Sequence, residues 1–256
     1  MKVLLLVSLL SLAIASADNS TEVPDELDAL PDSIITNGYQ AARGQAPYIV
    51  FLSFGNSFCG GTIIGPTWVV TASHCTKPYN SVTIYYGSLR RAQGEVVHTV
   101  RGNNIINHPS DDIALIRTPR VSFNNNIRSI RLPPQSERNN EYVGVTGLAC
   151  GWGETTSTST PNRLQCVNLQ VISQEECRRT YSADWAKPQV LCVATPGGRS
   201  TCFGDSGGPL TAENNQILIG VTNFVSARGC TSGDPSGFAR VTSHLDWINQ
   251  HTGISY

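Results

Sequence analysis

The sequence predicts an all-β fold that ends in one helix. From Tyr48 to the C-terminus, short runs of β-branched and aromatic residues alternate with turn clusters, which is typical of β-barrels and β-sandwiches. The last segment differs, because Leu245, Trp247 and Ile248 follow helical spacing. The length from residue 35 to residue 256 suits one or two domains.

The first segment of the chain is not expected to belong to this fold. Lys2 gives a basic start, residues 3–14 form an apolar stretch, and residues 15–17 (Ala-Ser-Ala) resemble a cleavage site, so residues 1–17 are predicted to be a signal peptide. The alternative, a membrane anchor, is disfavoured because no segment approaches about 20 apolar residues. We therefore expect a secreted, extracellular protein that does not contact a membrane.

Residues 18–34 form a second segment that we expect to lie outside the fold. The segment has six acidic residues, two prolines and no Lys or Arg, so it cannot build a core, and we interpret it as an acidic propeptide. The N-glycosylation sequon at Asn19 would be removed with it. Removing six acidic residues from 19 and one Lys from 18 bases leaves a net charge of +4, which does not favour nucleic-acid binding because the bases are scattered.

The expected strands follow in order along the chain, and each run is bounded by Gly, Pro, Asn or Ser. The strands are residues 48–54, 68–72, 82–86, 96–100, 113–117 and 217–221, and the helix is residues 242–251. The polar stretch 131–140 contains prolines and is expected to cross between two halves of the fold.

Residues 202–209, Cys-Phe-Gly-Asp-Ser-Gly-Gly-Pro, are the most informative stretch of the chain. A serine hydroxyl is a poor nucleophile at neutral pH and needs a base, together with donors for the oxyanion that it creates. Glycines on both sides of Ser206 allow a tight backbone that aims N–H groups at a reacting carbonyl. The alternative is an ordinary Gly-rich turn, and two upstream segments favour an acyl-transfer site.

Those two segments supply a base and a carboxylate. His74 ends an apolar strand and is followed by a cysteine that can hold it in place, although a lone His there is more often structural. Asp112 lies at the start of an apolar run, where a buried carboxylate needs a cation or a strong donor. His74 can be that partner, with its other nitrogen facing Ser206. Asp111 is the rival carboxylate, and we expect it to be solvated.

With His, Asp and Ser in this order, the sequence resembles the chymotrypsin/trypsin family of serine proteases from residue 35 to the C-terminus. The supporting motifs are Ile-Thr-Asn-Gly at 35–38, Thr-Ala-Ser-His-Cys at 71–75, Asp-Ile-Ala-Leu at 112–115, Gly-Trp-Gly at 151–153, the stretch 202–210, Phe-Ala-Arg-Val at 238–241 and Leu-Asp-Trp-Ile at 245–248. The two ends of this region are most similar to insect gut-type chymotrypsin- and elastase-like enzymes. The resemblance implies two six-stranded antiparallel β-barrels, about 35–133 and about 134–256, with the site between them.

The resemblance also implies the hydrolysis of peptide bonds through an acyl-enzyme. Ser206 would attack the carbonyl, His74 would take its proton and pass it to the leaving amine, and Asp112 would stabilise the imidazolium. The backbone N–H groups of Gly204 and Ser206 would form the oxyanion hole.

An activation step is implied as well. In the family, the freed N-terminal ammonium inserts beside the Asp that precedes the nucleophile and orders the oxyanion hole. Here these groups would be the amine of Ile35 and the carboxylate of Asp205, and losing either would leave a buried charge unpaired. Residue 34 is Ile, whereas zymogens activated by trypsin have Arg or Lys there. The activator is therefore expected to be another protease, or the enzyme itself.

The resemblance places Ser200 at the base of the substrate pocket, so the pocket would have no carboxylate to pair with a Lys or Arg side chain of the substrate. Val225 and Ser236 would be the walls, where open pockets have glycine, and Phe203 would cap the entrance. We therefore expect cleavage after apolar residues, with chymotrypsin- or elastase-like specificity.

The neighbouring residues would bind the substrate backbone. Phe224 and Val225 are expected to pair with the substrate strand. Asn223 departs from the family, which usually has a Ser that donates to the catalytic carboxylate. The Asn amide is also able to donate, but it is bulkier and could reduce activity.

All eight cysteines follow residue 35, and behind a signal peptide they are expected to form disulfides. We expect no zinc, because the chain has no Cys-x-x-Cys pair, no calcium, because only Glu95 lies between Cys75 and Asp111, and no cofactor. Cys150 and Cys166 lack the usual family partners, and their spacing suggests neighbouring strands, so we pair them with each other. The family pattern implies the other three pairs, which are Cys59–Cys75, Cys177–Cys192 and Cys202–Cys230.

The expected function is a monomeric serine endopeptidase of protein digestion, in an extracellular compartment such as a gut lumen, with protein or peptide substrates and protein protease inhibitors as partners. Digestion is favoured over signalling because the pro-segment has no Cys-rich module. The main alternative is a catalytically impaired homologue that acts as a binding or regulatory module, for which Asn223 and Ile34 are the reasons. An esterase with the same triad is a weaker alternative.

Overall fold

The computed structural model describes residues 35–156 and 160–256. The expected signal peptide at 1–17 and the expected propeptide at 18–34, with Asn19 and Ile34, lie outside the described residues. The described chain forms two antiparallel sheets and three α-helices, of which the longest is at the C-terminus. The predicted all-β class with a C-terminal helix is confirmed.

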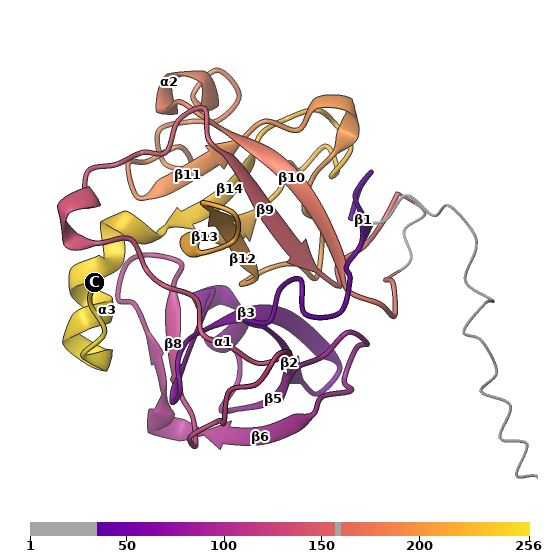
Figure 1. Cartoon of the computed structure of the whole chain (residues 1–256). Helices are drawn as coiled ribbons and strands as arrows, with labels where there is room; N and C mark the ends of the chain where they lie inside the picture. The colour runs from indigo at the N-terminus through magenta and orange to yellow at the C-terminus, as the bar shows by residue number, and fades with distance from the viewer. Residues whose placement is uncertain (1–34, 157–159) are drawn as a thin grey trace, which may run out of the picture. The chain divides into compact units, whose positions relative to one another are not determined.

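The first sheet, drawn in indigo to magenta in Figure 1, contains strands between residues 49 and 117. Its spatial order is β6 (Val96–Arg101), β5 (Ser81–Tyr86), β2 (Ile49–Phe54), β3 (Ser57–Gly65), β4 (Trp68–Thr71), β8 (Ala114–Arg117) and β7 (Ile105–Asn107). In the described chain β6 and β7 are open edges. The first sheet is therefore a half-barrel of seven strands, one strand more than the six that were expected.

The second sheet closes on itself. Its spatial order is β1 (Tyr39–Gln40), β10 (Gln165–Ile172), β11 (Val190–Val193), β14 (Ser236–Arg240), β13 (Ile217–Phe224), β12 (Pro209–Ala212) and β9 (Thr146–Gly151). Strands β9 and β10 also pair, with Cys150 opposite Cys166, so that all strands of this sheet except β1 form a closed barrel. The second half of the fold therefore matches the expected six-stranded barrel.

The burial of side chains follows from these two arrangements. Along β5, Val82, Ile84 and Tyr86 are buried and the residues between them are not, which is the period-two pattern of a sheet covered on one face. Strand β14 is buried at all five positions because it lies inside the closed barrel between β11 and β13. Ser236, the first residue of β14, is thereby held in the interior.

The three α-helices are α1 (Ser73–Thr76), α2 (Gln174–Cys177) and α3 (Leu245–Thr252). Helix α3 follows a 3-10 turn at Val241–His244 and ends at Gly253, which has the left-handed φ of 71° that favours glycine. Leu245 and Ile248 on α3 are buried in the apolar core. None of the described helices is long and apolar enough to cross a membrane.

The N-terminal segment belongs to the second sheet, although the sequence placed it with the first barrel. Tyr39 pairs with Cys166, and β1 lies beside β10 in Figure 1. Ile35 is fully buried in the core of the closed barrel, against residues such as Val167 and Phe238. The position of the N-terminal segment is set by strand pairing with residues that are distant in sequence, and local sequence patterns do not reveal such pairing.

The two sheets come into close contact at a pair of glycines. A Cβ on Gly60 would lie 2.8 Å from the Cα of Gly208, so neither position has room for a side chain. The Gly60 amide also donates to the carbonyl of Ser206 at 2.8 Å. The contact holds the turn around Ser206, on the second sheet, against strand β3 of the first.

Candidate active site

His74 and Asp112 are brought together by the pairing of β4 with β8. The strands are antiparallel, and Thr71 at the end of β4 lies opposite Ala114 at the start of β8. His74 follows β4 on the single-turn helix α1, and Asp112 precedes β8. Both side chains therefore emerge at the same end of the same strand pair.

The carboxylate of Asp112 binds His74 through two hydrogen bonds. Its Oδ1 accepts from the His74 backbone amide at 2.7 Å, and its Oδ2 lies 2.7 Å from the ring Nδ1. A carboxylate only accepts, so Nδ1 carries the proton and Nε2 retains its lone pair. The His74 side chain is 46% exposed and that of Asp112 is 22% exposed. Nε2 is therefore a basic nitrogen that a substrate can reach.

The turn that carries Ser206 packs against the segment that leads to His74. Gly207 has a φ of 76°, and a Cβ there would lie 2.1 Å from Thr71 Oγ1 and 3.0 Å from the amide nitrogen of Ala72. The Gly207 amide donates to the carbonyl of Thr222 at 2.8 Å. Glycine is required at this position by both the backbone conformation and the close approach.

The backbone at this turn leaves two amide groups free. Among the described residues, the N–H groups of Gly204 and Ser206 donate to no acceptor, whereas those of Asp205 and Gly207 do. Gly204 has a φ of 100°. Two unpaired N–H groups beside a serine are the donors that an oxyanion needs. Within the described chain, the Ser206 hydroxyl makes no direct hydrogen bond to His74, a contact that often forms only when substrate is bound.

Asp205 is fully buried next to the same turn. Its carboxylate accepts from the amides of Gly153 at 2.7 Å and Cys202 at 2.8 Å. In the described chain no cation pairs with it, and burial raises the pKa of Asp205 to about 7 in spite of these two donors. The Asp205 site therefore lacks a positive partner.

The segment that carries the expected partner of Asp205 is bound to Ser200. Thr36 forms two hydrogen bonds with Ser200: its hydroxyl donates to the Ser200 carbonyl at 3.1 Å, and its own carbonyl accepts from the Ser200 amide at 3.2 Å. Ile35, one residue earlier, is fully buried and has a φ of 40°, which a β-branched residue rarely adopts.

Ser200 and Ser236 lie together in the barrel interior. Both are 1% exposed, and their hydroxyl oxygens are 2.7 Å apart. The Ser200 hydroxyl also donates to the carbonyl of Thr201 at 2.7 Å. The pair offers hydroxyl groups and no charge.

The remaining expected pocket residues lie around the end of β13. A β-bulge between Thr222 and Phe224 makes Asn223 the unpaired extra residue of the strand. Within the described chain, Asn223 does not donate to the carboxylate of Asp112, whose two oxygens bind His74 instead. The bulge sets Asn223 apart from the regular pairing of β13 with β14.

Phe224, Val225 and Phe203 differ in exposure. The Phe224 ring packs on Tyr181 and Trp185 with centroids 5.1 Å apart in both cases, and it covers Gly237, which has no room for a Cβ. Val225 is partly exposed just beyond the end of β13. Phe203 is 57% exposed, as a side chain at an entrance would be.

Four disulfides hold the elements that carry these residues, and the described chain has no free cysteine. Cys75 in one of them lies 3.8 Å from His74 Nε2. The bonds join the four expected pairs, Cys59–Cys75, Cys150–Cys166, Cys177–Cys192 and Cys202–Cys230.

Asp111 is not solvated, which corrects the expectation from sequence. Its side chain is 13% exposed, its Oδ1 accepts from Lys187 at 2.6 Å, and its Oδ2 lies 3.3 Å from His244 Nε2. Burial would raise the pKa of Asp111, but the hydrogen bond from Lys187 and the charges of His244 and Lys187 together lower it. Both partners are distant in sequence, so no local signal could have identified them.

Asp111, His244 and His108 also form a cluster whose potential ligand atoms lie within 4.8 Å of one another. Two observations disfavour a metal there. The Lys187 ammonium already binds the carboxylate, and the Nδ1 of His108 accepts from the amides of Ser110 at 3.3 Å and Asp111 at 3.0 Å. A second group, Cys59, His74 and Cys75, has its two sulfurs in a disulfide.

Comparison with known proteins gives a consistent result. The family model described as Trypsin matches residues 35–248. The chain is similar to Serine protease 1 of Drosophila melanogaster, at 48% identity over 233 residues that cover 87% of each chain, and to Collagenase of Hypoderma lineatum, at 39% identity over 98% of this chain and 99% of that one. A solved structure of HL collagenase matches with a TM-score of 0.82 at 39% identity, covering 86% of this chain and 100% of its own. The chain therefore belongs to the trypsin family, and it is a serine endopeptidase of that family.

Proposed function

We propose that the protein is a secreted endopeptidase in which Ser206 is the nucleophile, His74 the general base and acid, and Asp112 the residue that orients His74. Ser206 would add to the peptide carbonyl while its proton passes to Nε2 of His74. The same proton would then go to the leaving amine, the C–N bond would break, and water would release the acyl group by the reverse sequence. The amides of Gly204 and Ser206 would bind the oxyanion, each contributing about 3 kcal/mol.

The observation that carries this proposal is the pair of unbonded amides beside Ser206. A tight turn normally uses its N–H groups within the protein, because unpaired buried donors are destabilising. Here the amides of Asp205 and Gly207 are bonded, whereas those of Gly204 and Ser206 have no acceptor among the described residues. The accessible Nε2 of His74, set by the bond between Nδ1 and Asp112, supplies the base.

We propose a preference for apolar residues before the scissile bond. The support is the Ser200–Ser236 pair, which presents two buried hydroxyls and no carboxylate to an entering side chain. A Lys or Arg side chain would lose its hydration without gaining a counter-charge. Val225 would form part of the wall, Phe203 would cap the entrance, and Phe224 and Val225 would align the substrate backbone.

We further propose that the full chain is a zymogen. Residues 1–17 would be the signal peptide and residues 18–34 the propeptide, and cleavage after Ile34 would create a new amine on Ile35. The buried, unpaired carboxylate of Asp205 supports this, since an ammonium would stabilise its charge strongly at that depth. The four disulfides fit an oxidising extracellular compartment. Digestion of dietary protein is the proposed role, with an activating protease and protein inhibitors as further partners.

The direct test uses the chain that begins at Ile35 and a series of peptides that differ only in the residue before the scissile bond. We expect kcat/KM to be highest for apolar residues and lower by on the order of 100-fold or more for Lys and Arg. The Ser206→Ala variant is the control and should cleave none of the peptides at a comparable rate. Highest activity on Lys or Arg peptides would contradict the proposed specificity.

A catalytically impaired homologue that acts as a binding module is the second candidate. The observation in its favour is Asn223, whose amide does not donate to Asp112 among the described residues. The folded chain with a free Ile35 amine would then cleave no peptide and no simple ester. In that case, restored cleavage by Asn223→Ser would identify the Asn223 side chain as the cause.

A further inference from the structure

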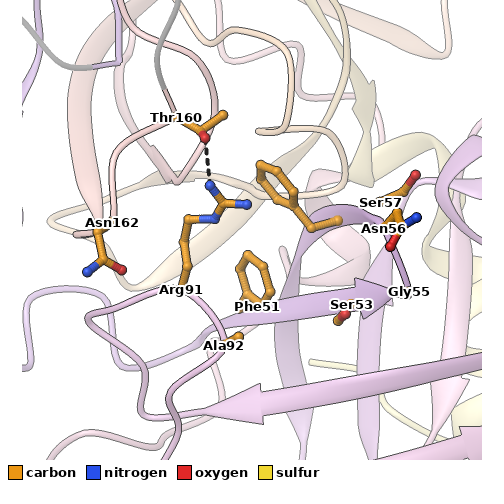
Figure 2. Close-up of a pocket in the computed structure, with 10 residues that line it drawn as sticks. Phe51, Ser53, Gly55, Asn56, Ser57, Arg91, Ala92, Thr160 and Asn162 are labelled. Carbon is orange, nitrogen blue, oxygen red and sulfur yellow. Dashed lines mark hydrogen bonds between the residues drawn. The ribbon is translucent and has the colours of Figure 1, made fainter.

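A cavity whose lining does not include Ser200 or Ser236 lies beside the turn that carries Ser206. It has a volume of about 440 Å³. We name it the Arg91 pocket after the cation in its lining, which includes Phe51, Ser53, Phe58, Arg91, Thr160 and Asn162. Figure 2 shows Arg91 and Thr160 on one side of the pocket and Ser53, Asn56 and Ser57 on the other, with Phe51 between them.

Arg91 is held in place by three contacts. Its backbone amide donates to the carbonyl of Asn162 at 2.9 Å, and its Nη1 donates to the hydroxyl of Thr160 at 2.6 Å, the dashed line in Figure 2. Its guanidinium carbon lies 4.2 Å from the centre of the Phe58 ring, a cation–π distance. The side chain is therefore positioned before any ligand arrives, which lowers the entropic cost of binding.

Among the described residues, the positive charge of Arg91 has no counter-charge. No residue that lines the pocket is acidic, and no ion pair to Arg91 occurs within the described ranges. Glu95, which lies in the same loop, is bound by Arg43, Asn124 and Asn126 instead. Arg91 keeps further N–H donors that are arranged to bind a carboxylate in a bidentate manner.

The pocket adjoins the proposed catalytic turn through Phe58. A Cβ on Gly204 would lie 2.7 Å from the Phe58 ring, so the ring touches the turn that ends in Ser206. The residue before the scissile bond would enter the second barrel at Ser200. The substrate would then leave on the opposite side of Ser206, over Phe58 and toward Arg91.

The path from the proposed nucleophile to Arg91 crosses a single aromatic ring. The Phe58 ring touches the Ser206 turn and carries the Arg91 guanidinium over its face, and an extended chain, which advances about 3.3 Å per residue, crosses such a ring in two or three residues. Phe51 and Phe58, whose rings stack with centroids 5.3 Å apart, give this segment an apolar surface.

We propose that Arg91 is a specificity-determining residue, which binds a carboxylate two or three residues after the scissile bond. The inference rests on the proposed function, since it requires Ser206 to be the nucleophile. The carboxylate can come from an Asp or Glu side chain or from the C-terminus of a short substrate. The enzyme would thus select acidic sequences on the leaving side while it selects apolar residues at Ser200.

The test measures kcat/KM for quenched fluorescent peptides with one constant sequence before the scissile bond. At the second and third positions after the bond they carry Asp or Asn, and a further pair ends there in a free carboxylate or an amide. Wild type should prefer Asp over Asn by about tenfold. Arg91→Met should bring this ratio close to one and change kcat/KM for the Asn peptide by less than about twofold. The free-carboxylate pair shows whether the chain terminus is also recognised.

Two further variants keep the test decisive. Arg101→Met removes an exposed positive charge elsewhere on the first sheet and should leave the Asp preference unchanged. Arg91→Lys keeps the charge without the planar fork and should give an intermediate ratio, even if Arg91→Met unfolds. An Asp preference that is absent in wild type, retained in Arg91→Met or equally reduced in Arg101→Met would overturn the inference. Cleavage of the Asn peptide reports on the proposed function separately, and its absence in the folded enzyme would overturn both.

Discussion

The Asp112 carboxylate forms two hydrogen bonds with His74: one oxygen accepts from the backbone amide and the other from the ring Nδ1, each at 2.7 Å. The first bond fixes the position of the His74 main chain at the start of α1, and the second fixes the ring and its tautomer. Neither carboxylate oxygen is bound by Asn223 in the described chain. The orientation of the base therefore depends on this one pair.

Replacing Asp112 with Asn should reduce kcat severely while leaving the fold intact. The amide would favour the wrong His74 tautomer, and the same change in the family's template triad lowers kcat by about 10⁴, which sets the expectation at neutral pH. Steady-state kinetics on an apolar peptide would measure it. Asp246→Asn, at a carboxylate that is 68% exposed, is the control and should retain full activity. A loss of less than about tenfold would contradict the role of Asp112.

Replacing Gly207 with Ala should destabilise the protein and abolish activity together. The new Cβ would lie 2.1 Å from Thr71 Oγ1 at a backbone φ of 76°, so the turn must move away from the His74 segment. Gly144→Ala, with a φ of 83° and open space around it, is matched for backbone strain alone. Urea denaturation should show a clearly larger loss of stability for Gly207→Ala, and activity should persist only in Gly144→Ala.

The uncleaved chain should lose stability as the pH rises from about 4 to about 7. The folded pKa of Asp205 is about 7, above its usual value of 3.8, so the folded state binds the proton more tightly than the unfolded state. This contribution is complete below the unfolded pKa and disappears as the pH passes the folded one. Thermal unfolding against pH would measure it in a Ser206→Ala background, which prevents self-cleavage. Adding Asp205→Asn should flatten the slope, as should starting the chain at Ile35, whose ammonium stabilises the ionised carboxylate.

Replacing Lys187 with Met should lower stability near neutral pH and reduce the loss of stability in acid. Asp111 now has a pKa below its usual value, so its contribution to stability is present above pH 3.8 and is lost as the pH falls through the lower, folded pKa. Without Lys187 the ionised carboxylate loses a partner that lowers its pKa, so stability should fall near pH 6 and less of it should remain to be lost as the pH falls. Melting temperatures from pH 2.5 to 6 should lie below those of wild type at pH 6 and approach them in acid. Lys77→Met, at an exposed lysine, is the control and should leave the dependence of the melting temperature on pH unchanged.

Removing the Cys150–Cys166 disulfide should lower the free energy of unfolding by about 3 kcal/mol. The two residues are directly opposite on β9 and β10 and are 16 residues apart in sequence, so the crosslink acts mainly on the unfolded chain. The double Cys→Ala variant should keep its activity at 25 °C, because the strands remain paired by backbone hydrogen bonds. An unchanged denaturation midpoint would show that the bond adds nothing to the pairing.

Much of this architecture could be predicted from local sequence. The strand 68–72 was expected from its apolar, β-branched run between turn residues, and the structure has it at Trp68–Thr71. The helix was expected at 242–251, but its first turn is 3-10 and the α-helix begins at Leu245. Chain order and glycine placement were enough to select His74, Asp112 and Ser206 as candidates for roles that the proposed experiments test.

The features that could not be predicted depend on contacts between residues that are distant in sequence. Asp111 was expected in solvent, but Lys187 and His244 reach it from segments more than 70 residues away. The displaced Asn223 results from a β-bulge that is visible only in the pairing of β13 with β14. The Arg91 pocket is built from three separate segments of the chain, and no motif marks it.

The central claim is that Ser206 becomes a reactive nucleophile when Ile35 has a free amine. The measurement that tests it most directly is labelling by a fluorophosphonate, which phosphonylates an activated serine and releases fluoride, followed by mass mapping of the adduct. The chain that begins at Ile35 should be labelled stoichiometrically at Ser206, and its His74→Ala variant and the uncleaved full chain should be labelled far more slowly. A folded chain with a free Ile35 amine that remains unlabelled, or that is labelled at another serine, would contradict the account.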